Sequence, residues 1–467
     1  MKRLGMCAVL FMALSISVPA FADGTIEDVI FYSDALGKEK PVQVYLPDGY
    51  DTSGLEYPVL YLLTEPIGPM ATTILATHLD QMTGTGLIDP MIVVSINGAC
   101  MPYSNWGFPM PMSSWWRNSE LSGAWKDALV TDLVTWVDSA SGYRTLANPH
   151  HRYVAGHYLG GGAAMMTALE FPEIFGAVTA SNGNAALEVY EAMLPMMLAT
   201  EYPGGPPYEY RPDAGPLSFS NFMLAAAFTP NVTASPWPID FWLDSDGDLI
   251  PEVWQRFVNQ TSPVLARDFA ATGGNLDIFF DCDSFGIMVP ACNLLHTTMD
   301  DLEIPHVVRG YADQSFSDRV PVYLTFFHPL NATVELSPRM MNGRHWWPLV
   351  TATIELPDDL DVADIDTMTL AITRINGDDL DRPIRALVAN EISDLNGNGR
   401  DDLTVWFWKP LLLRRLSDIG IEEHEPFDVT IEGETTDGWF LAATDEQRAI
   451  NMKVIETPWT LWPLAVD

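Results

Sequence analysis

The segment at residues 153–171 constrains the fold more than any other part of this sequence. A short apolar stretch at 153–155 leads into a glycine-rich turn, and residues 162–169 then have helical composition. Gly156 and Gly160 bracket the turn, and glycine adopts backbone conformations that other residues avoid. A strand that leads through such a turn into a helix is typical of chains in which strands alternate with helices.

The first two-thirds of the chain alternates buried strands with helices. The apolar runs at 58–63, 90–96 and 275–281 are typical of strands that are buried on both faces. Residues 125–137 place large apolar side chains about 3.6 residues apart, which predicts a helix. Strands that alternate with helices indicate a parallel sheet covered by helices on both faces.

The pattern changes near residue 330. Strand-like runs then follow at 350–356, 369–372, 403–407 and 427–432. Acidic, glycine-containing turns separate these runs, which predicts a β-sandwich. Because single cores rarely exceed about 250–300 residues, a chain of 467 residues is expected to form two domains. We expect an α/β domain at 23–330 and an all-β domain at 331–467.

The first 22 residues are typical of a signal peptide. Lys2 and Arg3 provide the basic start, residues 7–18 are apolar, and residues 20–22 form a small-x-small cleavage site. Cleavage near Ala22 predicts a secreted or periplasmic protein. No later apolar run is long enough for a transmembrane helix, so we expect none.

The chain is strongly acidic, with a formal net charge of −38. A surface of this sign repels nucleic acid and anionic lipid and favours cations, so nucleic acid is excluded as a partner. Three cysteines remain after the predicted cleavage, and an odd number does not define a disulfide framework. Cys282 and Cys292 can form a bridge in an oxidising compartment, but we expect buried free thiols.

Several segments together carry a family resemblance. They lie at residues 44–63, 114–145, 152–183, 276–282 and 304–306. In order and spacing they resemble the secreted esterase family of α/β-hydrolases, the group that contains S-formylglutathione hydrolase, feruloyl esterases and mycolyltransferases. The resemblance covers about residues 28–330. It implies an α/β-hydrolase fold, with a doubly wound and mostly parallel sheet, followed by the C-terminal all-β domain.

The nucleophile position departs from the family pattern. The family elbow Gly-x-Ser-x-Gly holds a serine on a strained turn, whereas this chain has Tyr158 at the centre of its elbow. A tyrosine side chain reaches further into the acyl pocket than serine. Its phenol, with an ordinary pKa near 10, also needs strong activation to attack at neutral pH.

The acid and base positions depart as well. The resemblance places Gly286 where the family has its aspartate and Ser315 where it has its histidine. Asp283 lies near the acid position and is an alternative, displaced acid. His306 precedes the strand that the catalytic histidine should follow, so we expect a structural role for it.

The oxyanion region is also altered. The family has His-Gly after the strand at 58–63, where this chain has Thr64 and Glu65. A carboxylate beside a developing oxyanion opposes the positive potential that catalysis needs. Leu159 follows the nucleophile position and completes the altered region. Together, these departures predict that the catalytic triad is lost.

The substrate groove has its own candidate residues. Trp115, Trp116, Arg117 and Asn118 match a family loop near the cleft, and aromatic rings beside Arg and Asn suit stacking on a sugar or phenolic ring. Together with Tyr158, they are the predicted ligand-binding residues. The alternative is that the two tryptophans pack the loop.

Two acidic loops have oxygen donors at spacings that suit Ca²⁺, a cation that takes six to eight oxygen ligands. The predicted ligands in the first loop are Asp244, Asp246, Asp248, the Ile250 carbonyl and Glu252. Those in the second loop are Asp394, Asn396, Asn398, the Arg400 carbonyl and Asp402. Neither loop has a glutamate at position twelve, so neither is a full EF-hand, and the alternative for both is a solvated polar turn.

These observations predict a secreted, non-catalytic esterase homologue. It is expected to bind a glycan, an ester-decorated polymer or a protein partner, with Ca²⁺ as a structural ion. The alternative is an active ester hydrolase or acyltransferase that uses Tyr158 or a displaced dyad.

Overall fold

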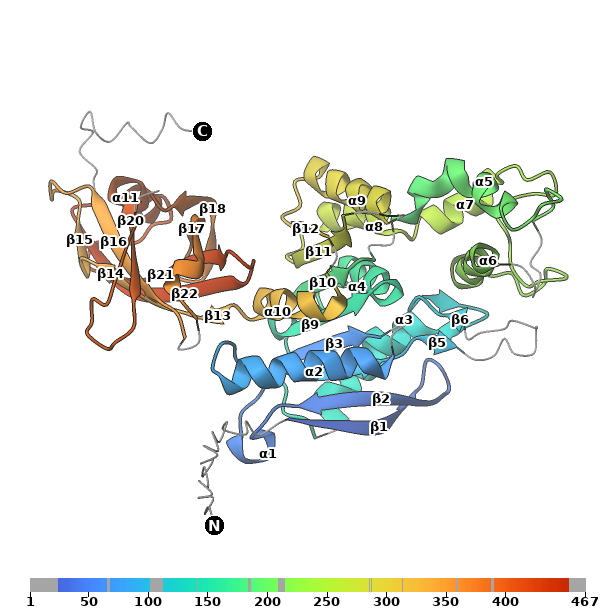
Figure 1. Cartoon of the computed structure of the whole chain (residues 1–467), viewed down its shortest axis with the longest axis horizontal. Coiled ribbons are helices and arrows are strands. Elements are labelled where there is room, and N and C mark those ends of the chain that lie inside the picture. Colours follow the sequence, from blue (N-terminus) through green and yellow to red (C-terminus); the bar gives the residue numbers. More distant parts are fainter. Residues whose placement is uncertain are drawn as a thin grey trace, which may run out of the picture.

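The computed structural model describes residues 24–64, 68–100, 112–140, 142–183, 186–208, 215–284, 286, 288–312, 314–357, 360–387 and 390–452. The predicted signal peptide lies outside the described residues. Figure 1 shows a helix-covered part formed by the first two-thirds of the chain and a strand-rich part formed by the remainder. No helix among the described residues is long and apolar enough to cross a membrane.

Within the described residues, the first part is built on an eight-stranded sheet with the order β1-β2-β4-β3-β9-β10-β11-β12. The strands are β1 (Thr25–Ser33), β2 (Lys38–Leu46), β3 (Val59–Leu63), β4 (Ile92–Ile96), β9 (Arg152–His157), β10 (Ala177–Ser181), β11 (Asp277–Asp283) and β12 (Val307–Tyr311). β1 and β2 are antiparallel to their neighbours, and the remaining strands pair in parallel. This is the predicted mostly parallel sheet.

Helices cover both faces of this sheet because its central strands are apolar on both sides. In β3, Val59 and Tyr61 face one core, while Leu60 and Leu62 face the other. The helices that contribute to the first core include α4 (Leu159–Glu170), α8 (Ser262–Thr272) and α9 (Val289–Asp301). Those that contribute to the second include α2 (Pro69–Gly84) and α10 (Phe316–Phe327).

The segment predicted as a helix at 125–137 is helical. It begins as α3 (Trp125–Asp127) and continues with π-type winding over Ala128–Leu133 and Trp136–Ala140. The side chains of Trp125 and Leu133 are fully buried. The expected apolar stripe therefore faces the core.

The second part packs two antiparallel-rich sheets against each other. One contains β13 (Leu330–Asn331), β15 (Met340–Asn342), β17 (Ile365–Ile375), β18 (Asp378–Arg385), β21 (Pro426–Thr435) and β22 (Phe440–Ile450). The other contains β14 (Thr333–Ser337), β16 (Leu349–Glu355), β19 (Asn390–Ser393) and β20 (Asp402–Trp408). Their apolar side chains share one core, to which α11 (Lys409–Asp418) adds its leucines. The predicted sandwich-like architecture is confirmed.

The two parts touch along β12 and α10. Arg309 on β12 donates hydrogen bonds to the Glu434 carboxylate at 2.6 Å and to the Gly438 carbonyl at 2.7 Å. The backbone N–H of Phe440 donates to Thr325 Oγ1 at 3.2 Å. These contacts fix the strand-rich part beside the edge of the large sheet (Figure 1).

Candidate functional site

The elbow geometry survives around Tyr158. This residue joins β9 to α4 with φ 50° and ψ −114°, a positive-φ conformation that non-glycine residues rarely adopt. A side chain at Gly156 would collide with the backbone of Gly160, and one at Gly183 would collide with the backbone of Tyr158. The glycines therefore permit the strained turn that the sequence predicts.

Tyr158 stands at an apolar cavity. Its side chain is 45% exposed and lines a cavity of about 230 Å³. Helices α5 (Leu194–Ala199), α6 (Pro216–Phe228) and α7 (Pro251–Val258) contribute much of the lining. The apolar lining includes the side chains of Trp115, Leu194, Met223, Trp242, Trp254 and Phe257. Polar side chains at the lining are few, and include Asn182, Ser220 and Asn221.

His157 lies beside Tyr158 but is engaged elsewhere. Its Nδ1 atom is 2.9 Å from Ser181 Oγ, within hydrogen-bonding distance, and its ring packs edge-on against the Tyr158 ring at 4.4 Å between centroids. Burial, together with the charge of Arg319, lowers the pKa of His157 to about 4. The imidazole is thus neutral at physiological pH, and its hydrogen bond is made within the core.

The predicted acid and base positions hold neither an acid nor a base. Gly286 is exposed in the loop after β11 and has φ 111°. Ser315 caps the N-terminus of α10, where its Oγ accepts from the backbone of Asp318 and donates to the Asp318 carboxylate at 2.8 Å. This helix cap explains the serine without any catalytic role.

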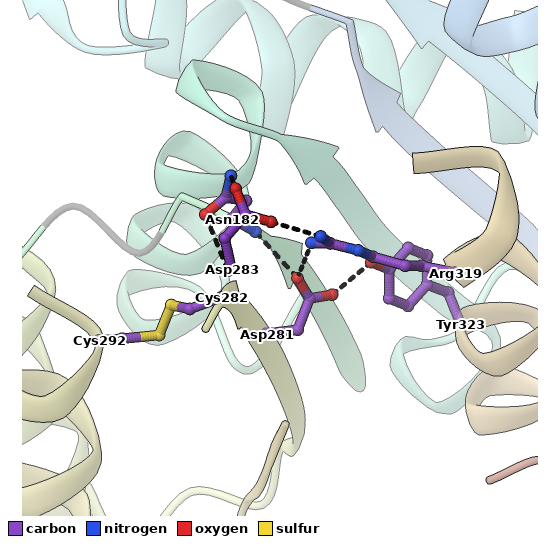
Figure 2. The surroundings of a disulfide bond; sticks show 7 residues. All are labelled: Asn182, Asp281, Cys282, Asp283, Cys292, Arg319 and Tyr323. Atoms are coloured by element: carbon purple, nitrogen blue, oxygen red, sulfur yellow. Dashed lines mark hydrogen bonds and ion pairs between the residues drawn. A yellow bond between two sulfur atoms is a disulfide. The ribbon is translucent and has the colours of Figure 1, made fainter. Parts of the chain in front are cut away.

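A buried ionic network occupies the region where an acid and a base would meet (Figure 2). Arg319 on α10 is 2% exposed and forms ion pairs with both Asp281 and Asp283. Tyr323 donates to the Asp281 carboxylate, and the Asn182 amide donates to Asp283 Oδ2 at 2.7 Å. Desolvation raises the pKa of Asp281 to about 6 in spite of these donors. Asp283, the alternative acid, is therefore paired with a guanidinium.

Sequence reasoning missed Arg319, although a signal was present. It is a lone basic residue within an otherwise largely apolar helix, at residues 316–327. A buried arginine needs a carboxylate partner, and the sequence offers Asp281 and Asp283 at the end of a buried strand.

In the predicted oxyanion region, Thr64 is engaged in hydrogen bonds with the neighbouring strand. The backbone N–H of Thr64 donates to the Ile96 carbonyl at 3.2 Å, and its hydroxyl is turned to the same carbonyl. Glu65 lies outside the described residues. Leu159 is the first residue of α4 and lines the cavity.

Of the residues in the predicted ligand-binding loop, one lies at the cavity and the others make contacts within the domain. Trp115 lines the cavity together with Tyr158. Trp116 is fully buried against Gly98, Arg117 is buried in a bidentate pair with Glu170, and Asn118 caps the start of α3. The structure thus places Trp116, Arg117 and Asn118 in packing, ion-pair and capping contacts of the domain, and none of the three lines the cavity.

The two acidic loops differ in their surroundings. Asp244, Asp246 and Asp248 are all exposed, and Asp244 Oδ1 accepts from the backbone of the other two. Ile250 is half-buried and precedes α7, whose first turn contains the exposed Glu252. These contacts describe a polar turn with no buried carboxylate.

The loop at 394–402 instead wraps around a mostly buried carboxylate. The amides of Asn396 and Asn398 each donate to Glu355 Oε2 at 2.9 Å, and Arg400 forms an ion pair with Glu355. Glu355, at the end of β16, is 9% exposed. Glu355 thus supplies a carboxylate to this loop, which lacks the glutamate found at position twelve of an EF-hand. Asp394 accepts from Gly397 and Gly399, and Asp402 accepts from Leu395.

Cys282 and Cys292 form a disulfide, so the expectation of free thiols at these positions is wrong. The bridge joins the end of β11 to the first turn of α9 (Figure 2), and the two Cα atoms lie 6.5 Å apart, within the range that a disulfide spans. Sequence spacing alone cannot show that a strand end and a helix start approach so closely. Cys100 is buried.

Comparisons with known proteins agree with this fold. Residues 33–248 match the family model described as "putative esterase". An endo-1,4-β-xylanase/feruloyl esterase of Xylanibacter ruminicola is 28% identical over 165 residues, which cover 33% of this chain and 21% of that protein. An esterase of Mycobacterium tuberculosis is 31% identical over 161 residues, which cover 34% of this chain and 32% of that protein. The matched segment thus spans a third or less of these relatives.

Solved structures of esterases are also similar to this chain. A ferulic acid esterase has 14% identity and a TM-score of 0.44, with coverage of 62% of this chain and 92% of that structure. An S-formylglutathione hydrolase from Agrobacterium tumefaciens has 16% identity and a TM-score of 0.42, with coverage of 66% and 95%. The family-model match over residues 33–248 and the mostly parallel, helix-covered sheet with its elbow thus identify an esterase-like α/β-hydrolase fold in this part of the chain.

Proposed function

We propose that this protein is a non-catalytic esterase homologue that binds the aryl or acyl group of an ester-bearing polymer in the cavity beside Tyr158. The ion pair between Asp283 and Arg319 carries the proposal. A guanidinium stays protonated throughout the physiological range and accepts no proton from a nucleophile. With Tyr158, Gly286 and Ser315 at the triad positions, none of the three retains the group that the family's mechanism needs.

The lining of the cavity decides which part of the polymer fits. Large apolar side chains such as Met223, Trp242 and Phe257 dominate it. Sugar hydroxyls would lose their hydrogen bonds to water in such a place, at a cost of several kcal/mol each in a fully apolar medium (roughly 4–8). An aromatic ring or an acyl chain loses no such bonds and gains from burial. The names of the matched relatives and structures include feruloyl esterases, which supports an aromatic acyl group as the ligand.

The strand-rich part offers a separate surface for the polymer chain. Trp346 is 80% exposed and Trp347 is 44% exposed, and their rings lie 5.4 Å apart between centroids. Exposed aromatic rings provide flat apolar faces for ring stacking. This supports a platform for the glycan backbone, and it agrees with secretion after cleavage near Ala22.

Ca²⁺ is proposed as a structural ion at the 394–402 loop. The oxygens of Asp394, Asn396, Asn398 and Asp402, the Arg400 carbonyl and the Glu355 carboxylate form a donor set of the kind that Ca²⁺ prefers. The loop at 244–252 has only exposed carboxylates and is the weaker candidate.

The second candidate function is ester hydrolysis or acyl transfer that uses Tyr158 or a displaced dyad. It is favoured by the retained elbow, which holds the Tyr158 side chain at the cavity. Such a mechanism needs a base for the phenol. The neighbouring His157 is neutral, but its Nδ1 atom is engaged with Ser181.

Methyl ferulate, as both ligand and ester, separates the two functions. Calorimetry should detect binding to the wild type, and chromatography should detect no free ferulate above the buffer rate. Ser220 is an exposed residue of the cavity lining, so Ser220→Trp should weaken binding at least about tenfold by filling the cavity. Ser417→Trp, at an exposed position on α11, is the matched control and should bind as the wild type does. Turnover that Tyr158→Phe abolishes would establish the second function instead.

A further inference from the structure

Three metal-ligating side chains converge at the C-terminal half of α9, outside the cavity. His296 and Asp300 are one turn apart on α9, so they share a face of the helix. His306 lies in the segment before β12. The His296 Nδ1 and His306 Nε2 atoms are 2.8 Å apart, and the Asp300 carboxylate lies 3.5 Å from His296 Nε2 and 3.8 Å from His306 Nε2.

The environment of His306 fixes which of its nitrogens is available. Its Nδ1 atom is 2.8 Å from the Ile304 carbonyl, which can only accept, so Nδ1 carries the proton and donates. Its ring stacks on Phe280 at an interplanar angle of 10°, and its side chain is 4% exposed. In the neutral imidazole, Nε2 therefore presents a lone pair toward His296. A histidine whose other nitrogen donates to a carbonyl is the usual arrangement of a metal ligand.

We propose that His296, Asp300 and His306 bind one divalent transition-metal ion, with Zn²⁺ as the best match. Imidazole suits zinc and related metals, whereas Ca²⁺ and Mg²⁺ prefer sites made only of oxygen. Two imidazoles and one carboxylate leave the fourth position of a tetrahedral zinc ion for water or an outside ligand.

The geometry needs only a small adjustment to accept the ion. Ligand atoms around a tetrahedral zinc lie about 3.4 Å apart, given bonds of about 2.0–2.1 Å. All the ligand atoms of the cluster lie within 4.8 Å of one another. The side chains of His296 and Asp300 are 42% and 60% exposed, so both can rotate. The buried His306 supplies the rigid anchor.

The Cys282–Cys292 disulfide holds the two halves of the site together. Cys292 lies one helical turn before His296 on α9, and Cys282 is two residues from Phe280, on which His306 stacks. The bridge therefore ties the helix that carries two ligands to the strand that positions the third. A site organised before the metal arrives loses less conformational entropy on binding.

Zinc titration of the purified, EDTA-dialysed full-length chain tests the proposal. Calorimetry measures the binding, and excess Ca²⁺ is present so that it fills any loop that offers only oxygen ligands. We expect one Zn²⁺ per chain, and Co²⁺ as a substitute should give the absorption of a tetrahedral ion. The exposed ligands allow variants that leave the fold intact. His296→Ala should weaken Zn²⁺ binding about 100-fold, and Asp300→Asn about 10-fold.

His345→Ala is the matched control, since this exposed histidine lies in the strand-rich part. It should bind Zn²⁺ as the wild type does. Equal affinity in the wild type and His296→Ala would overturn the proposal and leave a simple histidine–histidine hydrogen bond. Binding that survives His296→Ala but is lost in His345→Ala would likewise overturn it.

Discussion

Arg319 on α10 forms an ion pair with Asp283 at the end of β11. The same guanidinium pairs with the fully buried Asp281 at 2.7 Å. The guanidinium thereby links α10 to β11. Helix α10 follows the expected base position, Ser315, and strand β11 precedes the expected acid position, Gly286. The family's arrangement of a titratable histidine between a nucleophile and an acid has no counterpart in this network.

Removal of Arg319 should destabilise the fold strongly. Arg319→Ala leaves the buried Asp281 without its counter-charge, and breaking a buried pair costs about 3–5 kcal/mol. Urea unfolding of the full-length chain measures the change. Arg256→Ala is the control because it removes an ion pair of which the arginine is 45% exposed, and it should cost less than about 1 kcal/mol. If both variants lose a similar free energy of unfolding, the buried network contributes no more to stability than an exposed ion pair does.

Restoring the nucleophile alone should not restore hydrolysis. Tyr158→Ser supplies a hydroxyl on the elbow, but Ser315 and Gly286 still supply neither base nor acid, and triad members act as a unit. We expect no turnover of p-nitrophenyl acetate above the buffer rate and no rapid labelling by a fluorophosphonate probe. Rapid labelling of Tyr158→Ser, absent from the wild type, would reveal a base that the described contacts do not include.

Loss of the disulfide should lower stability moderately. The bridge closes a loop with a sequence separation of 10, for which the chain-entropy model gives about 2–3 kcal/mol. Cys292→Ser should reduce the free energy of unfolding by about that amount. A reducing agent should destabilise the wild type similarly and leave the variant unchanged. If the reducing agent destabilises Cys292→Ser as much as it destabilises the wild type, the effect does not come from this disulfide.

Calcium should stabilise the chain through the 394–402 loop. A ligand that binds only the folded state adds about 2.7 kcal/mol at a hundredfold excess over its Kd. Thermal melting of the full-length chain with Ca²⁺ and with EDTA measures the effect. Asp394→Ala and Glu355→Gln should abolish it, whereas Asp244→Ala should retain it. Identical melting of the wild type in both buffers would mean that the loop is a polar turn.

Mild acid should destabilise the protein in part through His157. Its folded pKa of about 4 lies below the value of about 6.5 expected when unfolded. The unfolded chain therefore binds the extra proton first, and stability falls as the pH drops from about 6.5 to 4, by up to about 3 kcal/mol.

His157→Asn removes this proton uptake, so its unfolding free energy should vary less with pH across this window than that of the wild type. His424→Asn, at an exposed histidine, should keep the wild-type dependence. Parallel pH curves for the wild type and His157→Asn would contradict the assignment.

The sequence by itself determined the strands and turns that depend on local patterns of residues. Continuous apolar runs predict the buried strands β3, β4 and β11, and each forms where expected. The glycines around Tyr158 predict the elbow because only residues without a side chain fit so close to neighbouring backbone. The tyrosine at the centre of the elbow is likewise visible in the sequence, since it depends on one position in a recognisable turn.

Only the tertiary structure decided which polar groups meet. Arg319 and Asp281 are separated by 38 positions. The local pattern of neither segment predicts that one guanidinium pairs with both Asp281 and Asp283. The same holds for the Cys282–Cys292 bridge and for the approach of His306 to His296. Periodicity reports which face of an element is buried, whereas the partners of a buried charge depend on how separate elements pack.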